Sequence, residues 1–218
     1  MILLSAQTYL SFFVVVSLIA VFISSVRSYR ATRRKLIQIK QKLESDISVA
    51  QMMQSEQRIS EFLKTNRLQP GVSIQIIADK LNIVEGGVQE DLTDRAWLSG
   101  PNENGKMTVV FKKGLSEEDY HFDFAHECGH LINGDPTPAT RPEGYNKPQA
   151  EQLADYTGAA LLMPFNKVCD FLDEHDYEKS SRRQKQILIR KLCDKYTVTE
   201  IIALRRIKEV YTLSLIHI

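Results

Sequence analysis

The feature that most constrains the fold is the pentapeptide His126-Glu127-Cys128-Gly129-His130, just past the middle of the chain. Two histidines four residues apart share a face only in a helix, where each residue advances by about 100°. Apolar residues flank the pentapeptide on both sides, and no proline interrupts it. The sequence therefore predicts a helix over residues 122–132 that presents both imidazoles in one direction.

Two imidazoles on one helix face are typical ligands of a catalytic zinc site. Such a site takes a third protein ligand and leaves a fourth position open for water. Glu127, next to His126, can reach that water. Glu151 follows in the next expected helix, and Asp155 lies one turn after it. We expect zinc to be bound by His126, His130 and Glu151, with Asp155 hydrogen-bonding a ligand imidazole from behind. The alternative is a chance pentapeptide and an ordinary surface glutamate.

The second helix is expected over Gln149 to Leu162, because Met163-Pro164 ends it. Ala150, Ala154 and Gly158 form a stripe of small residues along it, which would let two helices approach closely. Further elements are expected as a short helix over 73–81, a strand over 107–111, a loop over 134–148 and two or three more helices, the last around 199–211. This mixture predicts an α+β fold with a small sheet beside the motif helix.

The N-terminal segment Tyr9–Val26 carries no charge and is mostly apolar, which at about 1.5 Å per residue is near the minimum that spans a bilayer. Seven basic residues follow it before the first acidic residue, Glu44. A cleaved signal peptide has its positive charge before the apolar run instead. We expect residues 1–28 to be a transmembrane anchor, with the rest of the chain in the cytoplasm.

Residues 29–68 show apolar side chains at helical spacing from Ala31 to Asn66. They are interpreted as a juxtamembrane stalk through which two copies pair, or as an amphipathic helix packed on the domain, and both interpretations stay open. Gln69-Pro70-Gly71 marks a boundary before the domain at 69–212. The last six residues, 213–218, match the translation of a transposase end sequence used in DNA library preparation. We expect them to be an artefact; a natural apolar tail is the alternative.

The composition narrows the class of protein. The formal net charge is +1, so no direct nucleic-acid contact is expected, and the basic residues over 179–191 are interpreted as a solvated helix face. Three widely spaced cysteines without a C-x-x-C pair argue against a disulfide framework and a cysteine-rich zinc site. Cys128 lies about 200° round the helix from His126 and should face the core. His121 and His175 have no partner at useful spacing.

Two segments carry a family resemblance. Phe122–Leu131, FDFAHECGHL, resembles the F-T-x-A-H-E-x-G-H-x segment of the ImmA/IrrE metallopeptidases, and Glu151–Pro164, EQLADYTGAALLMP, resembles that family's E-x-E-A-N-x-F-A-A-x-L-L-M-P segment. The strand at 109–111 and the segment from 196 to 206 fit more loosely, so the resemblance covers residues 76–211. The chain departs from the second pattern at Leu153, Asp155 and Thr157-Gly158.

The resemblance implies that His126, His130 and Glu151 bind zinc, that Glu127 is the general base, and that the domain is a zincin-like peptidase acting on a cytoplasmic protein such as a transcriptional regulator. A non-catalytic zinc-stabilised module that binds a regulator or toxin partner at the membrane is the alternative, and a signalling stalk is a third. Tyr120, Arg141 and Tyr145 are the candidate hydrogen-bond donors to the oxyanion that forms during hydrolysis.

The substrate peptide is expected to pair with the strand over residues 107–112, taken as a sheet edge with unpaired backbone groups.

Overall fold

The computed structural model describes residues 47–135 and 147–215. The chain divides into two units, Met1–Glu44 and Ser45–Ile218. The predicted anchor at 1–28, with its apolar run at 9–26, lies outside the described residues, as does the predicted stalk up to residue 46. Within the described ranges, no helix is both long and apolar enough to cross a membrane.

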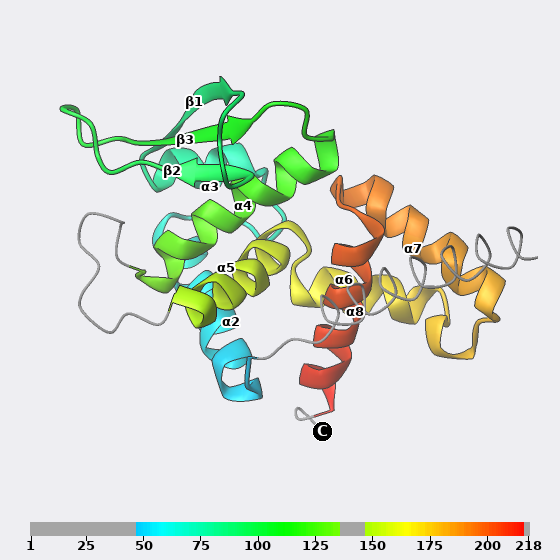
Figure 1. Cartoon of the computed structure of the whole chain (residues 1–218). Helices are drawn as coiled ribbons and strands as arrows, with labels where there is room; N and C mark the ends of the chain where they lie inside the picture. Colours follow the sequence, from blue (N-terminus) through cyan, green and yellow to red (C-terminus); the bar gives the residue numbers. More distant parts are fainter. Residues whose placement is uncertain (1–46, 136–146, 216–218) are drawn as a thin grey trace, which may run out of the picture. The chain divides into compact units, whose positions relative to one another are not determined.

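The second unit combines helices with a three-stranded sheet, which confirms the predicted α+β class (Figure 1). In chain order the elements are α2 (Val49–Thr65), α3 (Ile74–Lys80), β1 (Ile83–Gln89), β2 (Ala96–Leu98), β3 (Met107–Lys112), α4 (Glu117–Asn133), α5 (Lys147–Leu162), α6 (Phe165–Glu174), the 3-10 helix η2 (Tyr177–Lys179), α7 (Arg182–Tyr196) and α8 (Glu200–Ser214). The motif helix, the strand and the second ligand-bearing helix are all found where the sequence predicts them.

The strand β3 lies in the middle of the sheet, whose order is β1-β3-β2. β1 runs parallel to β3 and β2 runs antiparallel to it. The prediction that residues 107–112 form an edge strand is therefore wrong, because both sides of β3 are paired. The sequence pattern did not predict the two neighbouring strands. β2 has only three residues, and β1 contains Gly86-Gly87, a pair typical of turns. A Cβ on Gly86 would lie 2.2 Å from the Thr108 side chain, so a larger residue would displace that side chain at the register shift where β1 pairs with β3.

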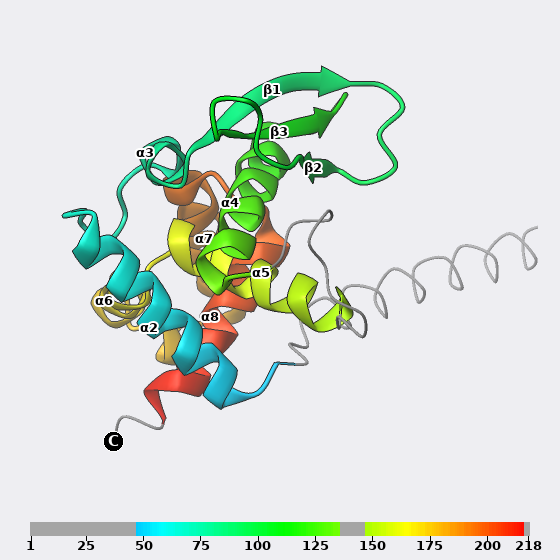
Figure 2. The same ribbon diagram turned by 90° about the vertical axis from the view of Figure 1, so that its left-hand side faces the viewer.

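Helix α4 packs against one face of this sheet (Figure 2). Val109 and Phe111 of β3 are buried there, and the Phe111 ring lies 4.1 Å from that of Tyr120 and 5.9 Å from that of Phe124 between centroids. Ser116 begins the helix by accepting a hydrogen bond from the Asp119 amide, and three acidic residues in the first turn suit the positive end of the helix dipole. Gly134 ends the helix in the left-handed conformation, at φ 77°.

Helix α2 packs on the domain. A capping box between Ser48 and Gln51 begins it, and its buried residues are Met52, Ser55, Ile59 and Leu63. This face contacts α4, α5 and α8. For Val49–Thr65 the packing favours the amphipathic helix over the stalk, because the apolar face that would pair two copies is covered by the domain itself.

At the other end of the chain, α8 runs to Ser214 and its Leu213 side chain is 2% exposed. Residues 216–218 lie outside the described residues.

Candidate metal centre

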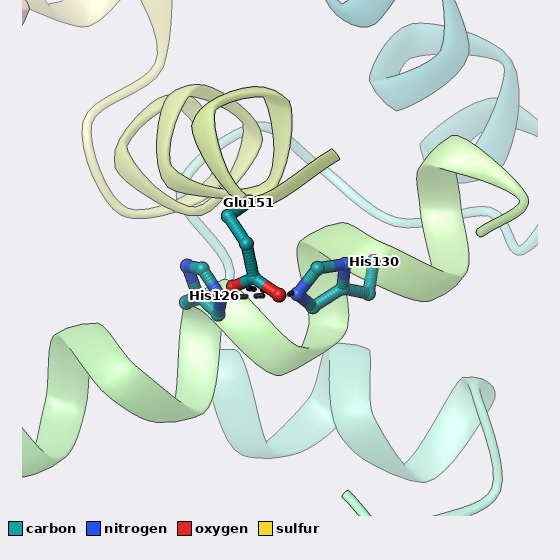
Figure 3. A group of neighbouring side chains, drawn as sticks. All are labelled: His126, His130 and Glu151. Atoms are coloured by element: carbon teal, nitrogen blue, oxygen red, sulfur yellow. Dashed lines mark hydrogen bonds and ion pairs between the residues drawn. The ribbon is translucent and has the colours of Figure 1, made fainter. Parts of the chain in front are cut away.

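The structure brings His126, His130 and Glu151 together (Figure 3). Both histidines come from one face of α4, and Glu151 comes from the first turns of α5. The Nε2 atoms of the two imidazoles are 3.0 Å apart, and Glu151 Oε2 lies 3.3 Å from His126 Nε2 and 3.6 Å from His130 Nε2. Three potential ligand atoms therefore converge on one point between two helices.

This donor set fits zinc. Bonds of about 2.0–2.2 Å in a tetrahedral arrangement separate neighbouring ligand atoms by about 3.3–3.5 Å. The three separations, 3.0, 3.3 and 3.6 Å, are centred on that value. Two imidazoles and one carboxylate are also the ligand types of catalytic zinc sites, which keep a fourth position for water. The three side chains could hold zinc with little movement.

Close packing of α4 on α5 makes this convergence possible. A Cβ on Gly129 would lie 2.7 Å from the Ala154 carbonyl oxygen, and one on Gly158 would lie 2.9 Å from the His126 amide nitrogen. No larger side chain fits at either position, because each glycine faces backbone. The small-residue stripe predicted on the second helix is thus the surface on which the motif helix lies.

Each imidazole is held from behind by a carboxylate. His126 Nδ1 lies 2.8 Å from Asp155 Oδ1, as the sequence predicts, and His130 Nδ1 lies 2.9 Å from Asp135 Oδ2. A carboxylate accepts from the Nδ1–H tautomer, which leaves Nε2 free to bind a metal. The sequence did not predict the role of Asp135 behind His130. Asp135 directly follows Gly134, the glycine that turns the chain back toward the last turn of α4.

Carboxylates dominate the electrostatics of the two imidazoles. Burial by itself lowers the pKa of His126, but the hydrogen bonds with Asp155 and Glu151 outweigh it and raise the pKa to about 10. The hydrogen bonds from both imidazoles hold the pKa of Glu151 well below its usual range. A positive charge between these carboxylates is therefore favoured, and a divalent ion would displace the proton of His126.

Glu127 lies on the same helix with its side chain buried, at 8% exposed. Burial raises the pKa of Glu127, while the neighbouring imidazoles oppose the rise. A carboxyl group whose pKa is raised toward neutrality is a better proton acceptor and donor than an exposed one.

An ion pair that the sequence did not predict lies one turn before Glu127. Asp123 shares the face of the helix that carries His130 and Glu127, and it is buried. Arg95, which immediately precedes β2, lies 2.9 Å from Asp123 and 2.7 Å from Asp119. Arg95 therefore ties β2 to the face of α4 that carries the metal centre.

The other candidate residues lie elsewhere. Cys128 is fully buried, as predicted, and faces the core. His121 contacts the Thr197 carbonyl and His175 the Phe171 carbonyl, so both are satisfied structural histidines. The Tyr120 ring packs against that of Phe111 at a tilt of 37°, and burial together with the neighbouring Glu85 of β1 raises the pKa of Tyr120, so this side chain lies against the sheet. Arg141 and Tyr145 lie outside the described residues.

Comparison with known proteins adds a family. Residues 86–208, more than half of the chain, match the profile of the Peptidase_M78 family, described as an IrrE N-terminal-like domain. A search of curated proteins returned no match. Among solved structures, a Mycobacterium tuberculosis transcriptional regulator aligns at 14% identity and a TM-score of 0.46, over 78% of this chain and 50% of that one. This chain spans about half the length of that regulator.

Proposed function

This chain belongs to the Peptidase_M78 family of IrrE N-terminal-like domains, and on that premise we propose that it is a zinc metalloendopeptidase that cleaves a cytoplasmic protein. A transcriptional regulator is the kind of substrate we favour. The observation that carries the proposal is the convergence of His126, His130 and Glu151 on one point, with buried Glu127 on the same helix. A purely structural zinc site has no use for a buried carboxylate beside its ligands.

The residues divide the chemistry among them. A zinc ion held by the three ligands would supply Lewis-acid chemistry, making water more acidic and a carbonyl more electrophilic. Glu127 accepts a proton from the attacking water as the water oxygen bonds to the carbonyl carbon of the peptide. The same carboxyl group then donates that proton to the amide nitrogen as the C–N bond breaks. Asp155 and Asp135 keep the two imidazoles in the Nδ1–H tautomer throughout.

The outer edge of β2, which pairs with no strand among the described residues, is the position we propose for the substrate backbone, in place of β3. The backbone amide of Lys112 donates to the Arg95 carbonyl, and the backbone amide of Ser99 donates to the Thr108 carbonyl. In an antiparallel pair these bonds alternate, so the Trp97 backbone also faces β3, while the Ala96 and Leu98 amides face the open side. An extended peptide can pair with those amides regardless of its side chains.

We also propose that residues 9–26 anchor the protein in the membrane and that the domain faces the cytoplasm. The support is the uncharged apolar run and the basic residues that follow it. Anchoring would confine hydrolysis to proteins that reach the membrane surface. Pairing of two copies through residues 29–46 remains part of this proposal; α2 takes no part in it, because its apolar face lies against the domain.

Glu127→Gln tests the proposed function. The full chain, purified in mild detergent and loaded with zinc, is incubated with a library of proteome-derived peptides, and new termini are identified by mass spectrometry. We expect the parent to cut peptides and Glu127→Gln to cut at least about a hundredfold more slowly with the same zinc content. Cleavage at the parent rate by Glu127→Gln would remove Glu127 as the base. Zinc binding without cleavage by the parent would favour the non-catalytic module.

A further inference from the structure

Helix α8 buries an unusual number of charges. Arg205 is 7% exposed, Arg206 is fully buried and Glu209 is 2% exposed. Moving a charge from water into a protein interior costs several kcal/mol unless partners compensate it. A helix that only closed a hydrophobic core would carry apolar residues at these positions. The buried charges therefore call for an explanation beyond packing.

One branch of this cluster leads to the metal centre. Arg205 Nη1 lies 3.0 Å from Asp155 Oδ2, and the other oxygen of the same carboxylate, Oδ1, lies 2.8 Å from His126 Nδ1. Asp155 is thus held between a guanidinium on one side and an imidazole on the other. Arg205 is itself fixed by Glu209, whose Oε1 accepts from Nε at 3.0 Å. The branch runs from Glu209 to Arg205, then to Asp155 and His126.

The other branch leads away from the metal. Arg206 donates through Nε to the Met163 carbonyl at 2.9 Å and through Nη2 to Glu56 Oε1 of α2 at 2.8 Å. The hydroxyl of Tyr156 donates to the same glutamate oxygen at 2.7 Å. These contacts join α8 to α2 and to the end of α5 (Figure 2). Both arginines lie near Glu209, whose Oε2 is 3.7 Å from Arg206 Nη1, but only Arg205 contacts Asp155, so Arg206 supplies a matched control.

We propose that Arg205 is a positioning residue of the metal centre, acting through Asp155 on His126. The Asp155 side chain is 37% exposed, so water competes for its oxygens and its carboxylate has room to rotate. A charge-assisted bond from a guanidinium that is itself fixed holds Oδ2 of Asp155 and leaves Oδ1 to accept from the imidazole N–H of His126. The inference rests on the metal site of the proposed function and assigns α8 a part in it.

Zinc affinity of the full chain tests this inference, measured by competition with a chromophoric chelator at fixed pH. Loss of a partner behind a metal ligand costs about 10–100-fold in affinity, so we expect that loss for Asp155→Asn and about tenfold for Arg205→Gln. Because Arg205 acts through Asp155, adding Arg205→Gln to Asp155→Asn should weaken binding no further. Arg205→Lys, which keeps the charge, should restore part of the loss.

Arg206→Lys is the control: it should lower the melting temperature of the metal-free protein and leave zinc affinity within about twofold. Parent-like zinc affinity in Arg205→Gln, or an effect that adds in full to that of Asp155→Asn, would overturn the inference. Should Arg205→Gln fail to fold, Arg205→Met, which removes the guanidinium and keeps an apolar chain of similar length in the buried position, decides by the same two criteria. A parent protein that binds no zinc would instead refute the proposed function, so the two failures are distinguishable.

Discussion

Replacing Gly158 by alanine tests the close approach of the two ligand-bearing helices. The added Cβ would lie 2.9 Å from the His126 amide nitrogen and 3.0 Å from the Ala125 carbonyl carbon. Ordinary contact begins near 3.4 Å, so α4 and α5 would have to separate by about 0.5 Å. Backbone atoms of a helix cannot rotate away as a side chain can. The whole interface would therefore move.

The magnitude follows from two opposing effects. Overpacking typically costs about 1–3 kcal/mol, and backbone contacts place Gly158→Ala in the upper half of that range. Alanine favours the helix over glycine by about 1 kcal/mol. The net destabilisation should be about 1–2 kcal/mol, which lowers the melting temperature of a domain of this size by about 2–8 °C. Zinc bonds tolerate errors of about 0.2 Å, so zinc affinity should also fall at least about tenfold.

Thermal unfolding by circular dichroism and chelator competition measure the two effects. Gly100→Ala is the matched control, since no atom lies within 4 Å of its added Cβ and stability should change by less than about 0.5 kcal/mol. Gly129→Ala probes the same interface from α4 and should behave like Gly158→Ala, because its Cβ would lie 2.7 Å from a carbonyl oxygen. A Gly158→Ala protein as stable as the parent, with parent zinc affinity, would refute the reasoning.

Three further predictions concern the substrate, pH and topology. Ala96→Pro removes an amide that faces the open side of β2, so cleavage should fall while zinc content and melting temperature stay unchanged. Trp97→Pro removes an amide that faces β3 and should instead weaken the sheet. Equal effects of the two substitutions on stability would contradict the pairing of β2 with β3 described above. In the metal-free protein the raised pKa of His126 stabilises the fold fully below about pH 6.5, and this stabilisation is lost as the pH rises toward about 10. The melting temperature should fall across that window and the fall should shrink in Asp155→Asn; an unchanged slope would refute the assignment. A cysteine at Gln69, with the native cysteines replaced by serine, should react with an impermeant maleimide only after cell lysis, and labelling of intact cells would reverse the topology.

The sequence was sufficient to predict that His126, His130 and Glu151 lie together, because its signals are local. The spacing of His126 and His130 sets them on one helix face, and the small-residue stripe beside Glu151 implies the second helix. Asp155 follows from Glu151 by one helical turn. Each inference depends only on helical periodicity, which one short segment contains in full.

What the sequence did not predict depends on contacts between distant segments. β3 became a central strand because it pairs with β1 and β2, whose own segments are glycine-rich or only three residues long. Arg205 and Glu209 are charged residues of the type that normally face solvent, and nothing local signals their burial. Asp135 is a local exception: it lies five residues from His130 and contacts it because Gly134, in the left-handed conformation, turns the chain back.

The central claim is that two imidazoles of α4 and one carboxylate of α5 bind a single zinc ion. Zinc K-edge X-ray absorption, with elemental analysis of the same full-chain sample, tests it most directly. The account predicts about one zinc per chain, with nitrogen and oxygen neighbours at about 2.0–2.2 Å and no sulfur neighbour, because Cys128 faces the core. Glu151→Gln should lower the occupancy. A sulfur shell at about 2.3 Å, or no stoichiometric zinc after zinc is supplied, would contradict the account.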